Sequence, residues 1–320
     1  MPELISMREA LNEALTDLGK ENPDVVVLDA DLAIAIKCSA FAAEFPDRFF
    51  QIGIAEQNMA GVAAGMATAG LIPFIGTFAC FASCRIADQV RTSIAQPGLS
   101  VKIMAPFAGL RTGQTGKTHQ AVEDIALYRG MPNMTIVSPA DGPETAQAVR
   151  AIARYPGPVY LRITRDPVPV LFGESHNFKI GLAYLLKKGS DLTLISTGNM
   201  TTIAVKAADV LAGEGLECTV LHVPTIKPLD VSAVVEAARS SGIVVTIEEH
   251  NIYGGLGGAV AEALSENFPV PVYRIGVNDC FGESGPNDPL MEKYGLTEHH
   301  VVEKAHVWVN RWRKANNLRK

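Results

Sequence analysis

The sequence predicts an α/β protein of two domains, each a mostly parallel β-sheet flanked by helices. Short apolar runs rich in β-branched residues alternate with segments of helical periodicity along the 320-residue chain. The runs are apolar at nearly every position, which is typical of parallel strands buried on both faces. A polar segment with prolines and a glycine interrupts this alternation near the middle of the chain and predicts a linker.

The apolar runs place the expected strands in order along the chain. They cover Val25–Leu28, Ile72–Gly76, Val101–Ala105, Thr135–Val137, Val159–Ile163, Leu192–Ser196, Glu217–His222, Ile243–Glu248 and Val272–Ile275. Helices are expected over Met59–Ala69, Ser83–Ser93, Pro143–Ala153, Thr201–Glu214 and Gly257–Phe268. Residues 1–19 have the pattern of an amphipathic helix and lack the basic start and apolar core of a signal peptide.

The break in the pattern divides the chain. Pro167, Pro169, Gly173 and the polar stretch Glu174–Lys179 disfavour a continuous helix or strand. We therefore expect an N-terminal domain over residues 1–166, a linker over 167–184 and a C-terminal domain over 185–320.

Composition and charge argue against several classes of protein. Hydrophobic residues make up 48% of the chain and charged residues 19%, and the net charge is -6 without a long run of one sign. This balance does not fit a nucleic-acid or membrane-surface binder, and no stretch reaches the roughly 18 apolar residues of a spanning helix. Five scattered cysteines without a CxxC pattern fit a cytoplasmic protein rather than a disulfide framework.

The segment Phe49–Ala69 holds the first candidate catalytic residue. Glu56 stands where a strand-like stretch passes into a helix of very small residues. Small side chains allow such a helix to pack closely, which would bring the carboxylate near an interface. A helix-capping role is the alternative, since acidic side chains are common in first helical turns.

Two further segments carry candidate ligand-binding residues. Phe78 and Phe81 open a helix three residues apart, a spacing compatible with a ligand platform or with the core. Residues 109–124 form a polar loop with three glycines that includes His119, and long polar loops in compact domains tend to be functional. The loop lacks the GxxxxGK[ST] spacing of a nucleotide P-loop, and no metal-ligating cluster stands out.

Together these segments resemble the C-terminal half of transketolase. The resemblance covers nearly the whole chain and rests on six blocks in order: GIAEQNMAGVAAGMA, TFACFASCR, GKTHQAVEDIALYRGMPNM, the SPAD at Ser138–Asp141, VYLRITR and EEHNIYGGLGGAVAE. It implies a pyrimidine-binding domain followed by a transketolase C-terminal domain. It also implies thiamine diphosphate (ThDP) and Mg²⁺ as cofactors.

The resemblance assigns the cofactor-binding residues. Glu56 matches the glutamate that hydrogen-bonds the aminopyrimidine of ThDP and thereby activates the cofactor. Phe78 and Phe81 match the aromatic pocket around that ring, with Phe81 as the stacking partner. Cys84 replaces the family's third aromatic residue, and Asp31 matches an aspartate near the cofactor.

The resemblance also implies substrate contacts. His119 matches a histidine beside the reacting carbon, able to move protons or hold a substrate oxygen. Arg165, and with it Arg162, match the arm that binds the anionic end of a sugar phosphate. Gln114 and Lys117 on the glycine loop are further candidate contacts.

The substrate end departs from the family pattern. Phe107 and Ala108 stand where transketolases carry a His-Asp pair, and Ala35 stands in place of a serine that binds donor phosphate. We therefore expect a ketose outside the usual pentose-phosphate set, such as a branched or sulfonated sugar.

The GDG…N motif, with which the upstream domain of transketolases holds Mg²⁺ and the diphosphate, does not occur in the sequence. We therefore expect a separate subunit, equivalent to the N-terminal half of transketolase, to supply that site and most of the Mg²⁺ coordination. The chain would be the β subunit of an α2β2 heterotetramer, self-associating through its C-terminal half and inactive without its partner.

The predicted activity is transfer of a two-carbon ketol unit from an anionic ketose to an aldose, a transferase reaction of class EC 2.2.1. The β subunit of a 2-oxo acid dehydrogenase E1 component has similar length and domains, but TFACFASCR and GKTHQ follow the transketolase pattern. A fragment related to deoxyxylulose-phosphate synthase and a non-catalytic regulatory subunit are further alternatives. The combination of Glu56, Phe81 and His119 argues against the regulatory subunit.

Overall fold

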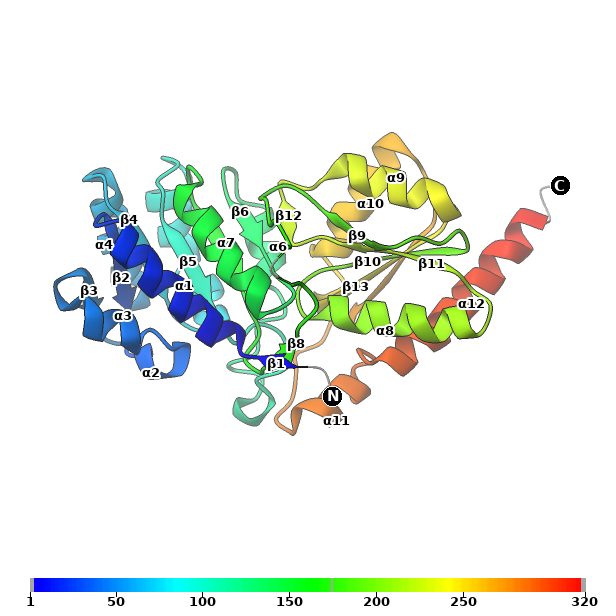
Figure 1. Ribbon diagram of the computed structural model, residues 1–320, viewed down its shortest axis with the longest axis horizontal. Helices are drawn as coiled ribbons and strands as arrows, with labels where there is room; N and C mark the ends of the chain where they lie inside the picture. Colours follow the sequence, from blue (N-terminus) through cyan, green and yellow to red (C-terminus); the bar gives the residue numbers. More distant parts are fainter. Residues whose placement is uncertain (1–2, 174, 318–320) are drawn as a thin grey trace.

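The computed structural model describes residues 3–173 and 175–317, with side chains to residue 315. Residues 1–2 of the expected first helix and Glu174 of the expected linker therefore lie outside the described residues. The chain folds into two lobes, each a β-sheet with helices on both faces (Figure 1). This architecture confirms the predicted α/β class with mostly parallel sheets.

The N-terminal sheet has seven strands in the order β12-β6-β7-β5-β4-β2-β3. They are β2 (Val25–Asp29), β3 (Phe49–Gln51), β4 (Ile72–Gly76), β5 (Lys102–Ala105), β6 (Thr135–Val137), β7 (Val159–Arg162) and β12 (Thr225–Lys227). The pairings are parallel apart from that of β12 with β6. Strands β2, β5, β6 and β7 are buried throughout, because helices cover both faces of the sheet.

The helices of this lobe surround that sheet. Helices α1 (Met7–Glu21) and α7 (Gly142–Arg154) lie side by side, and α4 (Glu56–Thr68) packs on β4 (Figure 1). The shorter helices are α2 (Ala33–Ile36), α3 (Ser39–Glu44), α5 (Ala87–Gln89) and α6 (Asp124–Arg129). The lobe also contains two 3₁₀ turns, η1 (Pro46–Arg48) and η4 (Gly113–Thr115), and two π-helical turns, η2 (Phe81–Arg85) and η3 (Val90–Ala95).

The C-terminal sheet has five strands in the order β14-β13-β10-β11-β9. They are β9 (Tyr184–Lys187), β10 (Leu192–Ser196), β11 (Cys218–His222), β13 (Val244–Asn251) and β14 (Val272–Val277), and β9 alone pairs antiparallel among them. Helices α8 (Met200–Gly213) and α12 (Glu298–Asn317) lie on one side, and α9 (Val231–Ser241) and α10 (Leu256–Asn267) on the other (Figure 1). Helix α11 (Asn287–Lys293) reaches toward the N-terminal lobe and contacts η4.

The structure differs from the prediction at the start of the first helix and within the expected linker. The first helix begins at Met7, because Ser6 accepts a hydrogen bond from Glu9 N–H as an N-cap and Leu4–Ile5 forms the strand β1. That strand pairs with β8 (Val168–Pro169), a two-residue strand inside the expected linker. Both strands are too short and too distant in sequence for periodicity to reveal them.

Two further differences concern longer segments. The helix expected over Ser83–Ser93 is wound mostly as the π-helical turns η2 and η3, and wide turns of this kind are frequent at functional sites. The strand β12 comes from the C-terminal half but joins the edge of the N-terminal sheet. The two halves therefore share a sheet, which a division at the linker did not predict.

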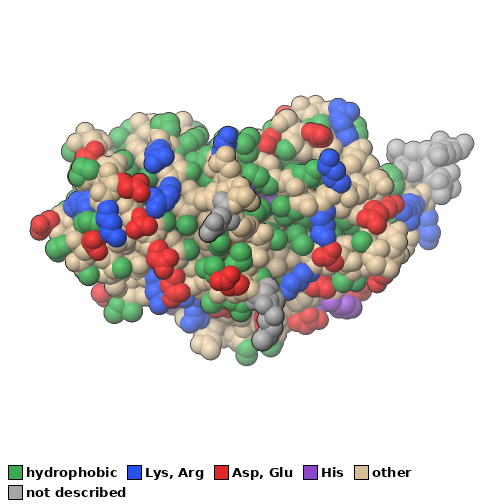
Figure 2. All heavy atoms as spheres, in the orientation of Figure 1, with side chains coloured by type: hydrophobic (Ala, Val, Ile, Leu, Met, Phe, Trp, Pro, Cys, Tyr) green, Lys and Arg blue, Asp and Glu red, His purple; other side chains and the backbone are tan. Residues whose placement is uncertain are grey.

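The surface over α1 and α7 carries interspersed acidic and basic side chains (Figure 2). Arg150 of α7 pairs there with Asp17 and Glu21 of α1. In the part of the chain that the structure describes, no helix combines the length and apolarity needed to cross a membrane.

A buried carboxylate joins the two lobes. Glu144 of α7 contacts His222 Nε2 of β11 at 2.9 Å and His176 Nε2 of the linker at 3.1 Å, and it accepts a hydrogen bond from Ala140 N–H. Burial alone would raise the pKa of Glu144, but the charge of His222 and these hydrogen bonds lower it from 4.5 to about 2. His222 is thus part of the lobe interface.

The Glu144→Gln substitution tests this interface. The folded-state pKa lies below the unfolded value, so the carboxylate stabilises the fold above about pH 4.5, and this contribution is lost as the pH falls toward 2. We expect the variant to lose ~3 kcal/mol of stability near neutral pH and the gap to wild type to shrink as the pH falls below 4.5. Unfolding temperatures measured across that pH range, with exposed Glu21→Gln as the control, check this. A gap independent of pH would contradict it.

Candidate active site

The predicted site residues gather at one edge of the N-terminal sheet. Asp31 follows β2, Phe78 follows β4, Phe107 follows β5 and Arg165 follows β7. Glu56 opens α4, which the chain enters soon after β3. Because these strands are parallel, their carboxyl ends lie along the same edge, where open α/β sheets bind ligands.

Glu56 is buried at the start of α4 and faces Arg85. Its side chain is 3% exposed, and Oε1 accepts a hydrogen bond from Arg85 Nη1 at 2.6 Å. Oε2 accepts no hydrogen bond from the residues that the structure describes, so this oxygen is available to a ligand. The helix dipole favours a carboxylate in this turn, but the side chain turns to Arg85 and makes no capping hydrogen bond within the described chain.

Arg85 connects Glu56 to an aromatic cluster. Its Cζ lies 4.0 Å from the ring centroid of Phe81, which stacks on Phe78 with centroids 6.0 Å apart. His119 presents its ring at a steep angle to both, at centroid distances of 5.4 Å from Phe81 and 6.0 Å from Phe78. The structure thus brings together side chains that lie far apart in the sequence. A carboxylate beside the partly exposed ring of Phe81 suits a flat heteroaromatic ring with a hydrogen-bonding nitrogen.

The sequence did not single out Arg85. Arg85 lies four residues after Phe81, and this spacing places both side chains on one face of a helix. The spacing could therefore have predicted that the two side chains meet. Its pairing with Glu56, 29 residues earlier, depends on how α4 packs against η2.

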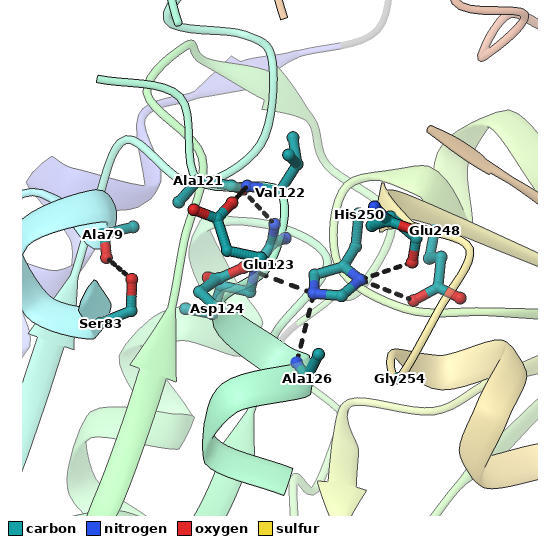
Figure 3. Close-up of polar contacts among 12 residues, drawn as sticks. Ala79, Ser83, Ala121, Val122, Glu123, Asp124, Ala126, Glu248, His250 and Gly254 are labelled. Carbon is teal, nitrogen blue, oxygen red and sulfur yellow. Dashed lines mark hydrogen bonds and ion pairs between the residues drawn. The ribbon is translucent and has the colours of Figure 1, made fainter. Parts of the chain in front are cut away.

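Cys84 forms a more polar wall beside this cluster. It is exposed, and its Sγ lies 3.5 Å from Glu123 Oε1. Partial burial and the charge of Glu123 raise the pKa of the thiol, so it stays protonated near neutral pH. Glu123 also accepts a hydrogen bond from Val122 N–H (Figure 3).

Asp31 lies beyond the end of β2 in an exposed position. Its backbone has a φ of +64°, and its N–H donates to Gln51 Oε1 at 2.8 Å. The Gln51 amide also contacts the buried Asp29 and the N–H of Gly53, so it joins the turns after β2 and β3. The carboxylate of Asp31 thus stands at the same sheet edge as Glu56.

Two arginines meet over Phe107 at the other end of the site. The Cζ atoms of Arg8 and Arg165 lie 5.0 and 5.5 Å from the centroid of its ring. Arg8 donates to the carbonyl oxygens of Arg165 and Ala35, at 3.1 and 2.6 Å. Burial and the neighbouring charge of Arg165 lower the pKa of Arg8. Two guanidinium groups beside one ring are suited to an anionic group of a ligand.

Phe107 supports these arginines in a strained conformation. Its φ of +65° lies in the left-handed region that bulky residues rarely adopt, at a cost of about 1–3 kcal/mol. The sequence singled out Phe107 and Ala35 as departures from the family, and the structure places both beside Arg8. Arg8 itself was missed, although a cation in the first turn of a helix opposes the helix dipole and could have signalled a role.

Arg162 lies inside the protein rather than beside Phe107. It is 4% exposed, and its Nε donates to Asp124 Oδ2 at 2.8 Å. Its Nη2 donates to the carbonyl oxygens of Ala121 and Glu249. Arg162 therefore has a structural role, whereas Arg165 is partly exposed. Gln114 and Lys117 are exposed on the glycine loop.

The end of β13 meets α6 on the far side of Arg162. His250 Nε2 accepts a hydrogen bond from Ala126 N–H and lies 4.0 Å from Asp124 Oδ1 (Figure 3). Its Nδ1 contacts Asn251 O at 2.7 Å and lies 3.8 Å from Glu248. Burial lowers the pKa of His250 to about 4, so the ring is neutral near pH 7 and donates through Nδ1. His250 thus fixes one lobe on the other.

Comparisons with known families agree with this fold. A family model described as transketolase, pyrimidine binding domain, matches residues 3–170, and one described as transketolase, C-terminal domain, matches residues 181–301. The chain belongs to the transketolase family, as the resemblance of its motifs predicted.

Its relatives include proteins described as transketolase subunits. The chain is 43% identical over 300 residues to a 6-deoxy-6-sulfo-D-fructose transketolase subunit, SqwH, of Clostridium sp. (strain MSTE9), covering 94% of this chain and 93% of the relative. It is 36% identical to an apulose-4-phosphate transketolase subunit of Phocaeicola vulgatus, covering 96% and 99% of the two chains. A solved structure described as a split gene transketolase, inactive β4 tetramer, is 47% identical with a TM-score of 0.88 and covers 96% and 98%.

Unfolding of the isolated chain distinguishes the two arginines. Arg162→Ala leaves Asp124 buried without its cation, so we expect a loss of ~3–5 kcal/mol. Arg165→Ala removes a partly exposed cation stacked on Phe107, so we expect a loss of about 1 kcal/mol or less. Denaturant unfolding of both variants measures the difference, and equal losses would contradict these assignments.

Proposed function

We propose that the chain is the β-type subunit of a split, ThDP-dependent transketolase. It would transfer a two-carbon ketol unit from an anionic ketose to an aldose, a reaction of class EC 2.2.1. The observation that carries this proposal is the cluster of Glu56, Phe81 and His119 at the carboxyl edge of a pyrimidine-binding fold.

The residues of this cluster fit the aminopyrimidine of ThDP. Bound ThDP supplies the reactive carbon that takes up and releases the ketol unit. Glu56 would hold a ring nitrogen through Oε2, with Arg85 fixing the other oxygen. Phe81 would stack on the ring, Phe78 would back it, and Asp31 would lie nearby.

His119 is suited to substrate oxygens. It lies on the loop beside the aromatic pair and is half-buried, with Thr118 Oγ1 2.9 Å from its Nδ1. An imidazole in this place can hold or move a proton at a substrate hydroxyl or carbonyl oxygen. The glycine-loop residues Gln114 and Lys117 would add contacts from the exposed side.

The proposal includes a partner subunit. The resemblance implies that ThDP diphosphate and Mg²⁺ are bound by the N-terminal half of transketolase, whose GDG motif the sequence lacks. The description of a 47% identical structure as an inactive β4 tetramer supports activity only after assembly with that partner. We propose an α2β2 complex in which the C-terminal halves of two such chains associate.

Reconstitution tests the shared site. Adding ThDP and Mg²⁺ should raise the unfolding temperature of the mixture with the partner, but not that of this chain alone, because a ligand stabilises only the state that binds it. Glu56→Gln should preserve assembly and lower turnover by at least ~100-fold, because it removes the group proposed to act on the pyrimidine.

The control for this variant is Glu13→Gln on the surface of α1, which should turn over like wild type. Strong stabilisation of the lone chain by ThDP would contradict the shared site. Unchanged exchange of the cofactor C2 proton in Glu56→Gln would contradict the role of Glu56.

The proposed donor is an anionic ketose outside the pentose-phosphate set. Arg8 and Arg165 form the anion site, while Phe107 and Ala35 replace a histidine and a serine of the family pattern. The loss of these polar groups weakens hydrogen bonding to a standard sugar phosphate but leaves both cations. Two relatives named for a sulfonated ketose and for apulose phosphate support such a donor.

A donor panel with the reconstituted complex tests this specificity. We expect 6-deoxy-6-sulfo-D-fructose or a branched ketose phosphate to exceed xylulose 5-phosphate in kcat/KM. Arg165→Ala should raise KM by about 10-fold or more, since an anion contact of this kind is worth ~1.5–3 kcal/mol, and Arg165→Lys should recover part of the loss. Full activity on xylulose 5-phosphate would contradict a shifted specificity.

A further inference from the structure

The loop that carries His119 is held from the C-terminal domain. We name residues 109–120 the His119 loop. Its tip residues Gln114, Thr115, Lys117 and Thr118 are exposed, whereas the loop residues on either side of the tip are mostly buried. A loop with this many glycines has many conformations, so its position depends on contacts beyond its own sequence.

Glu249 of β13 makes the most direct of these contacts. It is 2% exposed, and its Oε1 accepts hydrogen bonds from the N–H groups of Leu110 at 2.6 Å and Arg111 at 2.9 Å. Its Oε2 accepts a hydrogen bond from Asn199 Nδ2 at 2.7 Å. One buried carboxylate thus binds two successive N–H groups at the start of the loop, 138 and 139 residues earlier in the chain.

The start of the loop is shaped to admit this carboxylate. Gly109 has a φ of +77°, and a Cβ there would lie 2.5 Å from Glu249 Oε1. A side chain at this position would therefore collide with Glu249. The absence of a side chain allows the backbone to approach the carboxylate closely.

The C-terminal half also anchors the rest of the loop. Asn287 Oδ1 accepts from Gly113 N–H at 2.9 Å, and its Nδ2 donates to Arg111 O at 3.0 Å. Gln120, directly after His119, donates to Leu110 O and to Glu283 O. These anchors hold the loop before and after His119, so the direction of His119 is set from both sides.

We propose that Glu249 is a positioning residue of the active site, through which the C-terminal domain fixes the His119 loop for the reaction. The inference rests on the proposed function, because His119 acts on substrate only in that reaction. Without the carboxylate, two buried N–H groups would lose their acceptor and the loop would rearrange to satisfy them. The displacement would affect the substrate end and leave the contacts of Glu56 and Arg85 in place.

Glu248 provides a matched comparison on the same strand. It is fully buried and also accepts two backbone N–H groups, from Leu256 at 2.7 Å and Gly257 at 2.8 Å. Those N–H groups belong to the start of α10, on the opposite face of β13 (Figure 3 shows Glu248 beside His250). The two glutamates are therefore alike in burial and hydrogen bonding but differ in what they hold.

The experiment uses Glu249→Ala, Glu249→Gln and Glu248→Ala in the reconstituted complex. We expect Glu249→Ala to lower kcat/KM for the donor about 10- to 100-fold, the usual effect of a displaced catalytic group, with an unchanged ThDP-induced rise in unfolding temperature. Glu249→Gln should recover most of the activity, because an amide oxygen can accept from both N–H groups while Asn199 reverses its own amide. Glu248→Ala should lower the unfolding temperature but keep kcat/KM within about 3-fold at temperatures where it is folded.

Hydrogen exchange of the isolated chain supplies a readout independent of activity. The amides of Leu110 and Arg111 should exchange faster in Glu249→Ala than in wild type or Glu248→Ala, because they lose their acceptor. Equal losses of kcat/KM in the two alanine variants, or unchanged exchange at Leu110 and Arg111, would overturn the proposal. An inactive wild-type complex would refute the proposed function instead, and the exchange result would still decide whether Glu249 holds the loop.

Discussion

The end of β13 is the contact on which the candidate site depends. Three successive side chains of the strand accept hydrogen bonds from backbone N–H groups. Glu248 binds the start of α10, Glu249 binds the His119 loop and His250 binds α6. Asn251 N–H then donates to Val122 O at 2.7 Å, and Arg162 binds the carbonyl of Glu249. Glu248 thus holds a helix of its own domain, whereas Glu249 and His250 both bind elements of the N-terminal domain.

The junction between β13 and α6 contains a neutral histidine, His250, and a charged arginine, Arg162. His250 is neutral near pH 7, because burial costs a cation more than Asp124 returns to it at 4.0 Å. Asp124 instead accepts hydrogen bonds from Arg162 Nε and from Tyr160 O–H, both at 2.8 Å. The cation inside the junction is therefore an arginine, which keeps its charge when buried.

The sequence predicted the strands, but not that β12 of the C-terminal half joins the N-terminal sheet. Buried parallel strands can be recognised from short apolar runs of sequence. Residues that follow such strands lie close together, because the carboxyl ends of parallel strands share one edge of the sheet. Glu56, Phe78, Phe81 and His119 were singled out as candidates in this way and through their motifs, and the structure places them near one another. Arg8, Arg85 and Glu249 were missed because each acts through a partner distant in sequence, and a single sequence carries no record of such pairs.

The same limits explain why Arg162 and Arg165 looked equivalent. They lie three residues apart at the end of one strand, so both seemed able to reach an anion. Arg162 is the last residue of β7, and its side chain is held inside by Asp124, whereas Arg165 lies past the strand in the turn beside Phe107. Position relative to the strand end, rather than residue type, decides which arginine is buried against Asp124 and which stays partly exposed. The buried Arg162 also contributes to the position of the His119 loop. It donates to the backbone carbonyl of Glu249, whose side chain binds that loop.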